Sequence, residues 1–180
     1  MPIENERKFV IQGLKHSDLD QTCFRSKKIR QGYFNGKCRV REIDTGQSLY
    51  HYFTFKCNTE QGLVEIEQQI TIDDFNRLWP ETRDRLEKTR FSEYKPACRN
   101  FLWEIDFFGD LDDPYFVLAE CEIYNGYDAP GRLIDEVEKH VTYRVARDDK
   151  RFTSRKLADE AYARSLLQPT LFERVTGVKQ

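Results

Sequence analysis

The sequence lacks a long hydrophobic run. No apolar stretch approaches the roughly 20 residues of a membrane-spanning helix, and residues 1–13 contain no hydrophobic segment typical of a secretory signal. With only 9 glycines and 6 prolines in 180 residues, collagen-like and low-complexity chains are also excluded. We therefore expect a cytoplasmic protein that does not associate with membranes.

Cysteine and histidine are too few and too scattered for a disulfide framework or a zinc site. The five cysteines are odd in number, and no two of them form a C-x-x-C pair. They are predicted to be reduced thiols in a reducing compartment. The three histidines match none of the motifs described below, and we expect them to be surface residues or incidental.

Neither sign of charge dominates the chain. The 29 lysines and arginines against 31 acidic residues give a net charge of −2, which excludes a nucleic-acid binder that depends on bulk positive charge. Charged residues nevertheless make up 33% of the chain, beside 13 Phe, 9 Tyr and 2 Trp. Because disordered chains are poor in aromatic residues, this composition indicates a folded protein.

Alternation with a period of two dominates the pattern and predicts β-strands. Eight strands are expected, at residues 2–11, 28–34, 37–43, 48–57, 63–70, 86–94, 99–108 and 115–124. Asn35-Gly36 is a strong signal for a tight hairpin between the second and third of them. Eight strands joined by short loops imply an antiparallel meander that is able to close into a barrel.

Helices are few. They are expected at residues 72–79, 81–85, 130–141 and 154–167, while the polar tail from about residue 169 to 180 is expected to be flexible. No linker or internal repeat divides the chain, so residues 1–180 are predicted to form one domain. The predicted class is mainly β (α+β), an eight-stranded antiparallel β-barrel forming a charged tunnel, with a few helices packed outside.

One face of nearly every predicted strand is charged, and the signs are sorted by strand. The mixed strand carries Glu4, Glu6 and Lys8; the basic positions are Arg39 and Arg41, Lys56, and Lys88 and Arg90; the acidic positions are Glu65 and Glu67, Glu104 and Asp106, and Glu120 and Glu122. An ordinary sheet with one solvated face also alternates. Such faces usually mix in Thr, Ser and Gln, however, and neighbouring like charges repel unless something is bound.

A barrel with this face turned inward would bind a polyanion together with divalent cations. Rows of lysine and arginine require anionic groups, and rows of carboxylates require cations. With oxygen ligands and no matching His or Cys, the expected metal is Mg²⁺ or Mn²⁺. Phosphoryl transfer is the chemistry that combines a cationic clamp with carboxylate-bound metals.

The first of these charged segments, Glu4-Asn5-Glu6-Arg7-Lys8, resembles the ExExK signature of the CYTH family, the triphosphate tunnel metalloenzymes. The other motifs follow in the family's order: Arg30-Gln31-Gly32-Tyr33, Arg39 and Arg41, Lys56, Glu65 and Glu67, Glu87-Lys88-Thr89-Arg90, Trp103-Glu104-Ile105-Asp106, Glu120 and Glu122, Val141-Thr142, and Asp149-Lys150-Arg151-Phe152. The resemblance covers about residues 2–160 and is strongest to the short bacterial inorganic triphosphatases of the family.

The resemblance implies a role for each motif position. The residues that would bind phosphates are Lys8, Arg39, Arg41, Lys56, Lys88 and Arg90. The first metal would be bound by Glu4, Glu6 and one or both of Glu120 and Glu122. A second metal would be bound, or the attacking water oriented, by Glu65 and Glu67, with Glu122 as a further candidate. Tyr33 matches a tyrosine that partners a lysine near the scissile bond, although ordinary strand packing would explain it equally well. Lys8, Tyr33, Glu65 and Glu67 are therefore the candidate catalytic residues. Lys150 and Arg151 would close one mouth of the tunnel or form a solvated face.

Two departures from the family pattern bear on substrate choice. Leu63 stands where relatives often carry arginine, and residues 143–148 are additional. Three functions follow from the motifs: a metal-dependent hydrolase of tripolyphosphate, or of thiamine or nucleoside triphosphates; a class IV adenylyl cyclase; and a non-catalytic polyphosphate binder. The short chain and the complete carboxylate set favour hydrolysis of tripolyphosphate to pyrophosphate and phosphate. Whether the protein is a monomer or a homodimer is left open.

Overall fold

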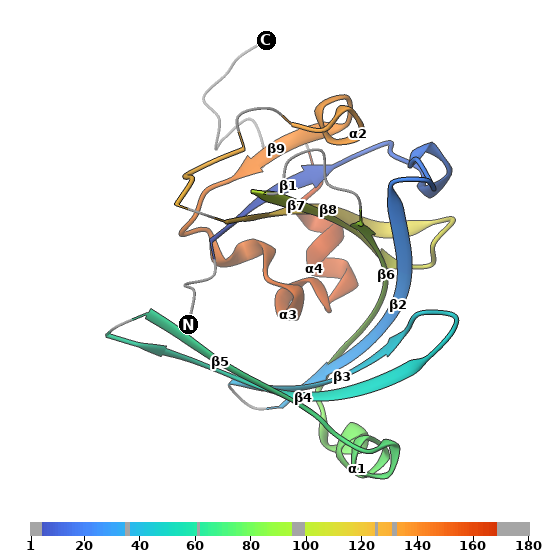
Figure 1. Ribbon diagram of the computed structural model, residues 1–180, viewed down its shortest axis with the longest axis vertical. Helices are drawn as coiled ribbons and strands as arrows, with labels where there is room; N and C mark the ends of the chain where they lie inside the picture. The colour runs from blue at the N-terminus through green and yellow to red at the C-terminus, as the bar shows by residue number, and fades with distance from the viewer. Residues whose placement is uncertain are drawn as a thin grey trace.

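Nine antiparallel strands form one strongly curved sheet in the computed structural model, which describes residues 5–34, 37–60, 62–94, 100–124, 126–130 and 133–168 (Figure 1). The strand order is β5-β4-β3-β2-β6-β7-β8-β1-β9. The strands are β1 (Glu6–Ile11), β2 (Phe24–Tyr33), β3 (Cys38–Asp44), β4 (Leu49–Thr59), β5 (Gly62–Gln69), β6 (Asp84–Glu93), β7 (Phe101–Gly109), β8 (Pro114–Ile123) and β9 (Val141–Val145). The predicted mainly β class is confirmed.

Each of the eight predicted strands is present, and a ninth strand was missed. Strand β9 lies where the sequence predicts the end of a helix and additional residues, and it pairs with β1. Val141, Tyr143 and Val145 alternate with polar residues there, which is a strand pattern of only five residues. Glu4, the turn residues 35–36 and the tail from residue 169 lie outside the described residues.

The sheet is not closed, so the expectation of a closed eight-stranded barrel is wrong. Strands β5 and β9 are its two edges and do not pair with each other. Figure 1 shows the sheet curling around the C-terminal helices, which lie in the hollow between these edges. Phe152 and Leu157 of this C-terminal segment are buried with Val10, Phe116 and Leu118 of the sheet. Burial of these side chains fills one end of the hollow with an apolar core.

The helices are short: α1 (Ile72–Leu78), α2 (Asp135–Glu138), α3 (Ser154–Leu157), α4 (Glu160–Ser165) and the 3-10 helices η1 (His16–Asp18), η2 (Trp79–Glu81) and η3 (Lys150–Phe152). The predicted helix at 81–85 is wrong, because the chain enters β6 at Asp84. The predicted helix at 154–167 is divided, since Asp159 accepts a hydrogen bond from Tyr162 N and caps a new helix. None of the helices in the described ranges is long and apolar enough to cross a membrane.

The concave face of the sheet is apolar at one end and charged at the other. On β8, Phe116 and Leu118 contact the core around the C-terminal helices, and the next two residues on the same face are Glu120 and Glu122. The opposite face of β8, with Val117, Ala119, Cys121 and Ile123, packs into a second apolar core on the convex side. Packing on both sides therefore fixes the positions from which the carboxylates project.

Candidate active site

The charged end of the hollow is a cavity of about 550 Å³. Of the 22 described residues that line it, nine are lysine or arginine and seven are acidic. Thirteen of the residues proposed for the site line it: Glu6, Lys8, Tyr33, Arg39, Arg41, Lys56, Glu65, Glu67, Lys88, Arg90, Glu120, Glu122 and Lys150. Arg7, one position out of phase on β1, instead donates to Asn5, Glu6 O and Asp128 O.

Arg151 does not line the cavity, in contrast to its neighbour Lys150. Its guanidinium donates to Asp149 Oδ2 at 2.6 Å and to the Tyr143 hydroxyl at 3.1 Å. The hydrogen bonds to Asp149 raise the pKa of Arg151. Arg151 thus links η3 to Tyr143 of β9 and does not face the cavity. Arg147 and Arg155, which the sequence analysis did not single out, line the cavity from the C-terminal segment.

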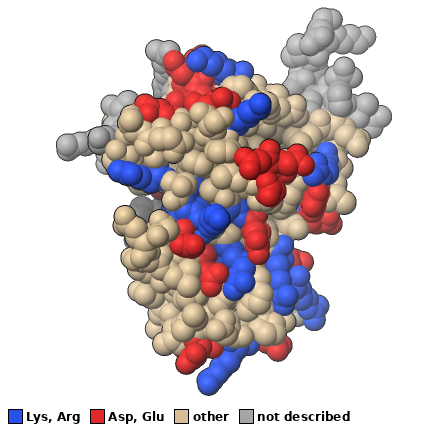
Figure 2. Space-filling view, turned by 90° about the vertical axis from the view of Figure 1, so that its right-hand side faces the viewer, with Lys and Arg blue, Asp and Glu red and all other residues tan. Residues whose placement is uncertain are grey.

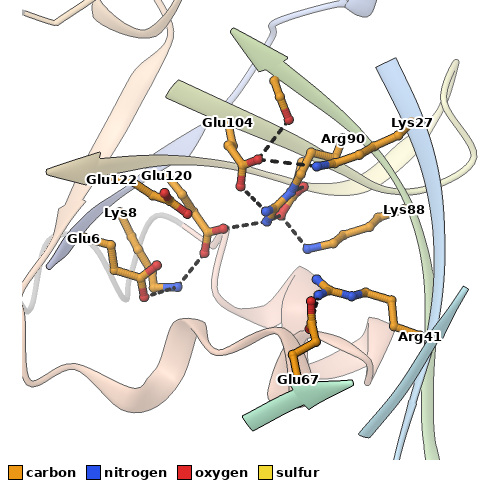
Figure 3. A network of polar contacts seen from close by, with 12 residues as sticks. Glu6, Lys8, Lys27, Arg41, Glu67, Lys88, Arg90, Glu104, Glu120 and Glu122 are labelled. Carbon is orange, nitrogen blue, oxygen red and sulfur yellow. Dashed lines mark hydrogen bonds and ion pairs between the residues drawn. The ribbon is translucent and has the colours of Figure 1, made fainter. Parts of the chain in front are cut away.

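Lys8 lies between two of the carboxylates proposed to bind metal (Figure 3). Its Nζ is 3.0 Å from Glu6 Oε1 and 2.5 Å from Glu120 Oε1. Burial alone would lower the pKa of Lys8, but Glu120 and Glu6 together raise it above the ordinary lysine value. Burial likewise opposes ionisation of Glu120, yet Lys8 and Arg90 hold its pKa far below the usual range. Both groups are therefore charged near neutral pH.

Asp106 on β7 is fully buried and forms ion pairs with two cations of the cavity, Lys88 and Arg90. It accepts two hydrogen bonds from Arg90, each 2.6 Å long, and one from Lys88 Nζ at 2.5 Å. Arg90 also donates to Glu120 at 2.6 Å and to Glu104 (Figure 3). Burial and the nearby Arg90 lower the pKa of Lys88 to about 8. The sequence analysis assigned no role to Glu104 and Asp106, although the period of two had already placed both on the charged face of their strand.

Arginines and carboxylates also pair across β3, β4 and β5. Arg39 Nη2 is 3.4 Å from Glu65 Oε1, and Arg41 Nη2 is 2.5 Å from Glu67 Oε2. Lys56 Nζ is 2.8 Å from Glu65 Oε2. The Nε atoms of Arg39 and Arg41 are buried and donate to no acceptor among the described residues. Buried donors of this kind are costly unless an acceptor is supplied, so they point to an anionic ligand.

Tyr33 lies at the side of the cavity next to this arginine pair. Its hydroxyl accepts a hydrogen bond from Nε2 of the buried Gln31 at 2.7 Å. Burial raises the pKa of Tyr33, and the positive charge of Arg39 opposes the rise. The phenol therefore keeps its proton near neutral pH. Gln31 is a further residue of the site that the sequence pattern did not distinguish from ordinary packing.

Comparison with known proteins shows which family the chain belongs to. The chain is 33% identical over 121 residues to an inorganic triphosphatase of Nitrosomonas europaea, an alignment that covers 66% of this chain and 75% of the relative. The chain belongs to the inorganic triphosphatase family. The resemblance to the bacterial inorganic triphosphatases is thereby confirmed, although no model of a protein family matches the sequence.

Solved structures agree with this family membership. The crystal structure of the inorganic triphosphatase NE1496 matches with a TM-score of 0.51 and 27% identity, covering 88% of this chain and 95% of that one. The PH1819 protein from Pyrococcus horikoshii matches with a TM-score of 0.50 and 19% identity, covering 76% and 82% of the two chains. The latter shows the fold alone.

The carboxylates of this triphosphatase-family cavity have the chemistry of a divalent metal site. Glu6 and Glu122 are directly opposite each other on β1 and β8, and Glu120 lies two residues along. Like charges in this arrangement repel unless a cation lies between them, and oxygen-only donors suit Mg²⁺ or Mn²⁺. Within the described residues no three ligands are already gathered around one point, because the Lys8 ammonium lies between Glu6 and Glu120.

A second hollow lies on the convex side of the sheet of this family member. Its volume is about 790 Å³, and it is lined by residues that include Lys28, Arg30, Glu42, Asp44 and Glu87. Acidic side chains outnumber basic ones there, which disfavours a polyanion. Figure 2 shows Lys and Arg atoms interleaved with Asp and Glu atoms across this face of the molecule. The smaller, cation-rich cavity on the concave side is therefore the better phosphate site.

Proposed function

We propose that this protein is a metal-dependent inorganic triphosphatase that cleaves tripolyphosphate to pyrophosphate and phosphate. The observation that carries the proposal is the cavity lining, in which sixteen of the 22 described residues are ionised side chains of both signs. A substrate that consists of charged oxygens, together with divalent cations, matches such a lining. The family membership of the chain supports the same reaction.

The cations of the cavity bind the phosphates in this proposal. Arg39 and Arg41 line the cavity, and their buried Nε donors lack an acceptor among the described residues. Guanidinium groups bind phosphate through charge-assisted hydrogen bonds. The remaining proposed phosphate ligands are Lys8, Lys56, Lys88, Arg90 and Lys150. Ion pairs with carboxylates already order Lys8, Lys56, Lys88 and Arg90, so that little further ordering of these four side chains is needed when substrate binds.

Glu4, Glu6, Glu120 and Glu122 would bind one divalent cation, Mg²⁺ or Mn²⁺. When bound, it supplies charge stabilisation for the phosphate oxygens and the leaving pyrophosphate. Glu65 and Glu67, held by Arg39, Arg41 and the Thr54 hydroxyl, would bind a second cation or accept the proton of the attacking water. The water oxygen then bonds to the terminal phosphorus as the bond to pyrophosphate breaks. Lys8 and Tyr33 are proposed to lie near that bond.

Inorganic tripolyphosphate is favoured over a nucleotide substrate by the chemistry of the lining. Among the described lining residues the aromatic side chain is Tyr33, and its hydroxyl is already hydrogen-bonded to Gln31. A base would have to bind among ionised side chains at the cavity mouth. The class IV adenylyl cyclase reaction therefore has no observation in its favour.

We expect hydrolysis of tripolyphosphate only when a divalent metal is present. Incubation with tripolyphosphate and Mg²⁺ or Mn²⁺ should release one phosphate and one pyrophosphate, which ion chromatography resolves, and the same mixture with excess EDTA should release neither. ATP serves as the comparison substrate. Substantial turnover in EDTA, or cyclic AMP as the only product from ATP, would contradict the proposal.

A pair of arginine variants tests which strand face binds substrate. Arg41 lines the cavity, whereas Arg7 on the opposite face of β1 does not. Loss of charge-assisted bonds to phosphate in Arg41→Ala should lower kcat/KM about a hundredfold or more. Arg7→Ala should stay within about threefold of the unmodified protein. Equal losses in the two variants, measured by phosphate release at a temperature where both are folded, would show that the face is wrongly assigned.

A further inference from the structure

Tyr124 hydrogen-bonds directly to one carboxylate of the proposed metal site. Its hydroxyl donates to Glu122 Oε2 at 2.5 Å. Tyr124 is two residues from Glu122 along an extended backbone, so both side chains leave the chain on the same face. Tyr124 N donates to Asn100 O at 2.9 Å, and Ile123 N donates to Asn5 O at 2.8 Å. These bonds continue the pairing of β8 with both neighbours and hold Tyr124 in place.

Glu122 differs from the other two carboxylates in the kind of partner it has. Glu6 and Glu120 form ion pairs with Lys8, and Glu120 forms a second with Arg90. Within the described part of the chain Glu122 forms no ion pair, and its side chain is bonded by the neutral Tyr124 hydroxyl. Of these three carboxylates, Glu122 is thus the one whose negative charge is offset by no direct contact with a cation of the described residues.

A neutral donor orients a carboxylate without competing for its charge. A lysine beside Glu122 would have to be displaced before a metal ion could bind, whereas a phenol occupies one oxygen and leaves the other for the cation. A phenol is un-ionised at neutral pH, so the Tyr124 hydroxyl is available there as a hydrogen-bond donor. Outer-sphere hydrogen bonds of this kind commonly orient metal ligands in proteins.

We propose that Tyr124 is a positioning residue for the metal site, whose hydroxyl fixes the Glu122 carboxylate for a divalent cation bound with Glu6 and Glu120. This inference rests on the proposed metal-dependent function. It assigns Tyr124 no contact with substrate. Its effect is on metal affinity rather than on the chemical step.

The test compares Tyr124→Phe with Tyr127→Phe in the full chain. Tyr127 is also exposed, and its ring packs edge-on against Phe101 at 5.5 Å, so it is a matched control. Calorimetric titration with Mn²⁺ alone should show about tenfold weaker binding in Tyr124→Phe and unchanged binding in Tyr127→Phe. At saturating Mn²⁺, kcat for tripolyphosphate should return to the unmodified value. Unchanged Mn²⁺ affinity, or a loss of kcat that metal does not restore, would overturn the positioning role.

A double variant keeps the test decisive if Tyr124→Phe is also less stable. When Glu122→Gln is already present, Tyr124→Phe should cause no further loss of Mn²⁺ affinity, because the ligand it positions is gone. An equal loss in both backgrounds would mean that Tyr124 acts by another route, and the inference fails. If the unmodified protein binds no Mn²⁺ and hydrolyses tripolyphosphate in EDTA, the proposed function itself fails. The two failures are therefore distinguishable.

Discussion

Asp106→Asn should lower the free energy of unfolding by about 3–5 kcal/mol, the typical result of removing one partner from a buried ion pair. Asp106 is fully buried, and its two oxygens bond Arg90 and Lys88. Asparagine keeps the size but not the charge, so Lys88 is left buried without its anionic partner. Urea unfolding at neutral pH in EDTA measures this loss without any metal contribution.

The exposed Asp112 provides the control for this substitution. Its carboxylate pairs with His16, and its side chain is 88% exposed, so Asp112→Asn should change the unfolding free energy by about 1 kcal/mol or less. Adding Lys88→Met to Asp106→Asn removes the stranded charge and should recover part of the stability but none of the activity. A double variant no more stable than Asp106→Asn alone would show that the Lys88–Asp106 pair is not the cause.

The same pairs determine how Asp106 contributes to stability at low pH. Burial opposes ionisation of Asp106, but Arg90 and Lys88 lower its pKa below the ordinary aspartate value. A lowered carboxylate pKa in the folded state contributes stability that is present above the unfolded-state pKa. That contribution is lost as the pH falls through the folded-state pKa. In Asp106→Asn the free energy of unfolding should therefore fall less between neutral and acidic pH than it does in the unmodified protein, because the variant has no Asp106 carboxylate to protonate.

The arrangement of the site could be predicted from the sequence because strand alternation specifies which residues share a face. Once Lys88 and Arg90 are placed on one face of a strand, their neighbours on adjacent strands follow from the period of two. How deeply each side chain is buried does not follow from this alternation. Asp106 and Glu122 alternate in the same way, yet Asp106 lies beneath Arg90 whereas Glu122 lines the open cavity. Depth depends on how strongly the sheet curves, which alternation does not encode.

The closure of the barrel and the placing of Arg151 were predicted differently from what the structure shows, and both depend on features that strand alternation does not encode. Closure of a barrel needs two edges far apart in sequence to pair, and no local pattern shows that the C-terminal helices would fill the space between β5 and β9. Lys150 and Arg151 were treated as one motif, but successive residues of the 3-10 helix η3 point about 120° apart. Lys150 lines the cavity, whereas Arg151 does not.

Glu6→Gln should abolish most hydrolysis without destabilising the metal-free protein. In that state Glu6 lies opposite Glu122 and near Glu120, so removing one negative charge relieves repulsion, while Lys8 keeps Glu120 as a partner. The melting temperature in EDTA should be equal or higher. Because a ligand that binds only the folded state stabilises it, Mn²⁺ with tripolyphosphate should raise the melting temperature of the unmodified protein.

In Glu6→Gln this rise should shrink sharply. The value of kcat/KM should fall by more than about a hundredfold, the upper end of the effect of outer-sphere changes at metal sites, since a metal ligand itself is altered. Glu138→Gln, a substitution at an exposed position of α2, should match the unmodified protein in every measurement. A Glu6 that served only as a salt bridge to Lys8 would give a near-neutral variant with full activity. Thermal scans of the three proteins, with and without metal and tripolyphosphate, separate these outcomes, because a purely structural Glu6 cannot remove the ligand-dependent shift while leaving the metal-free melting temperature intact.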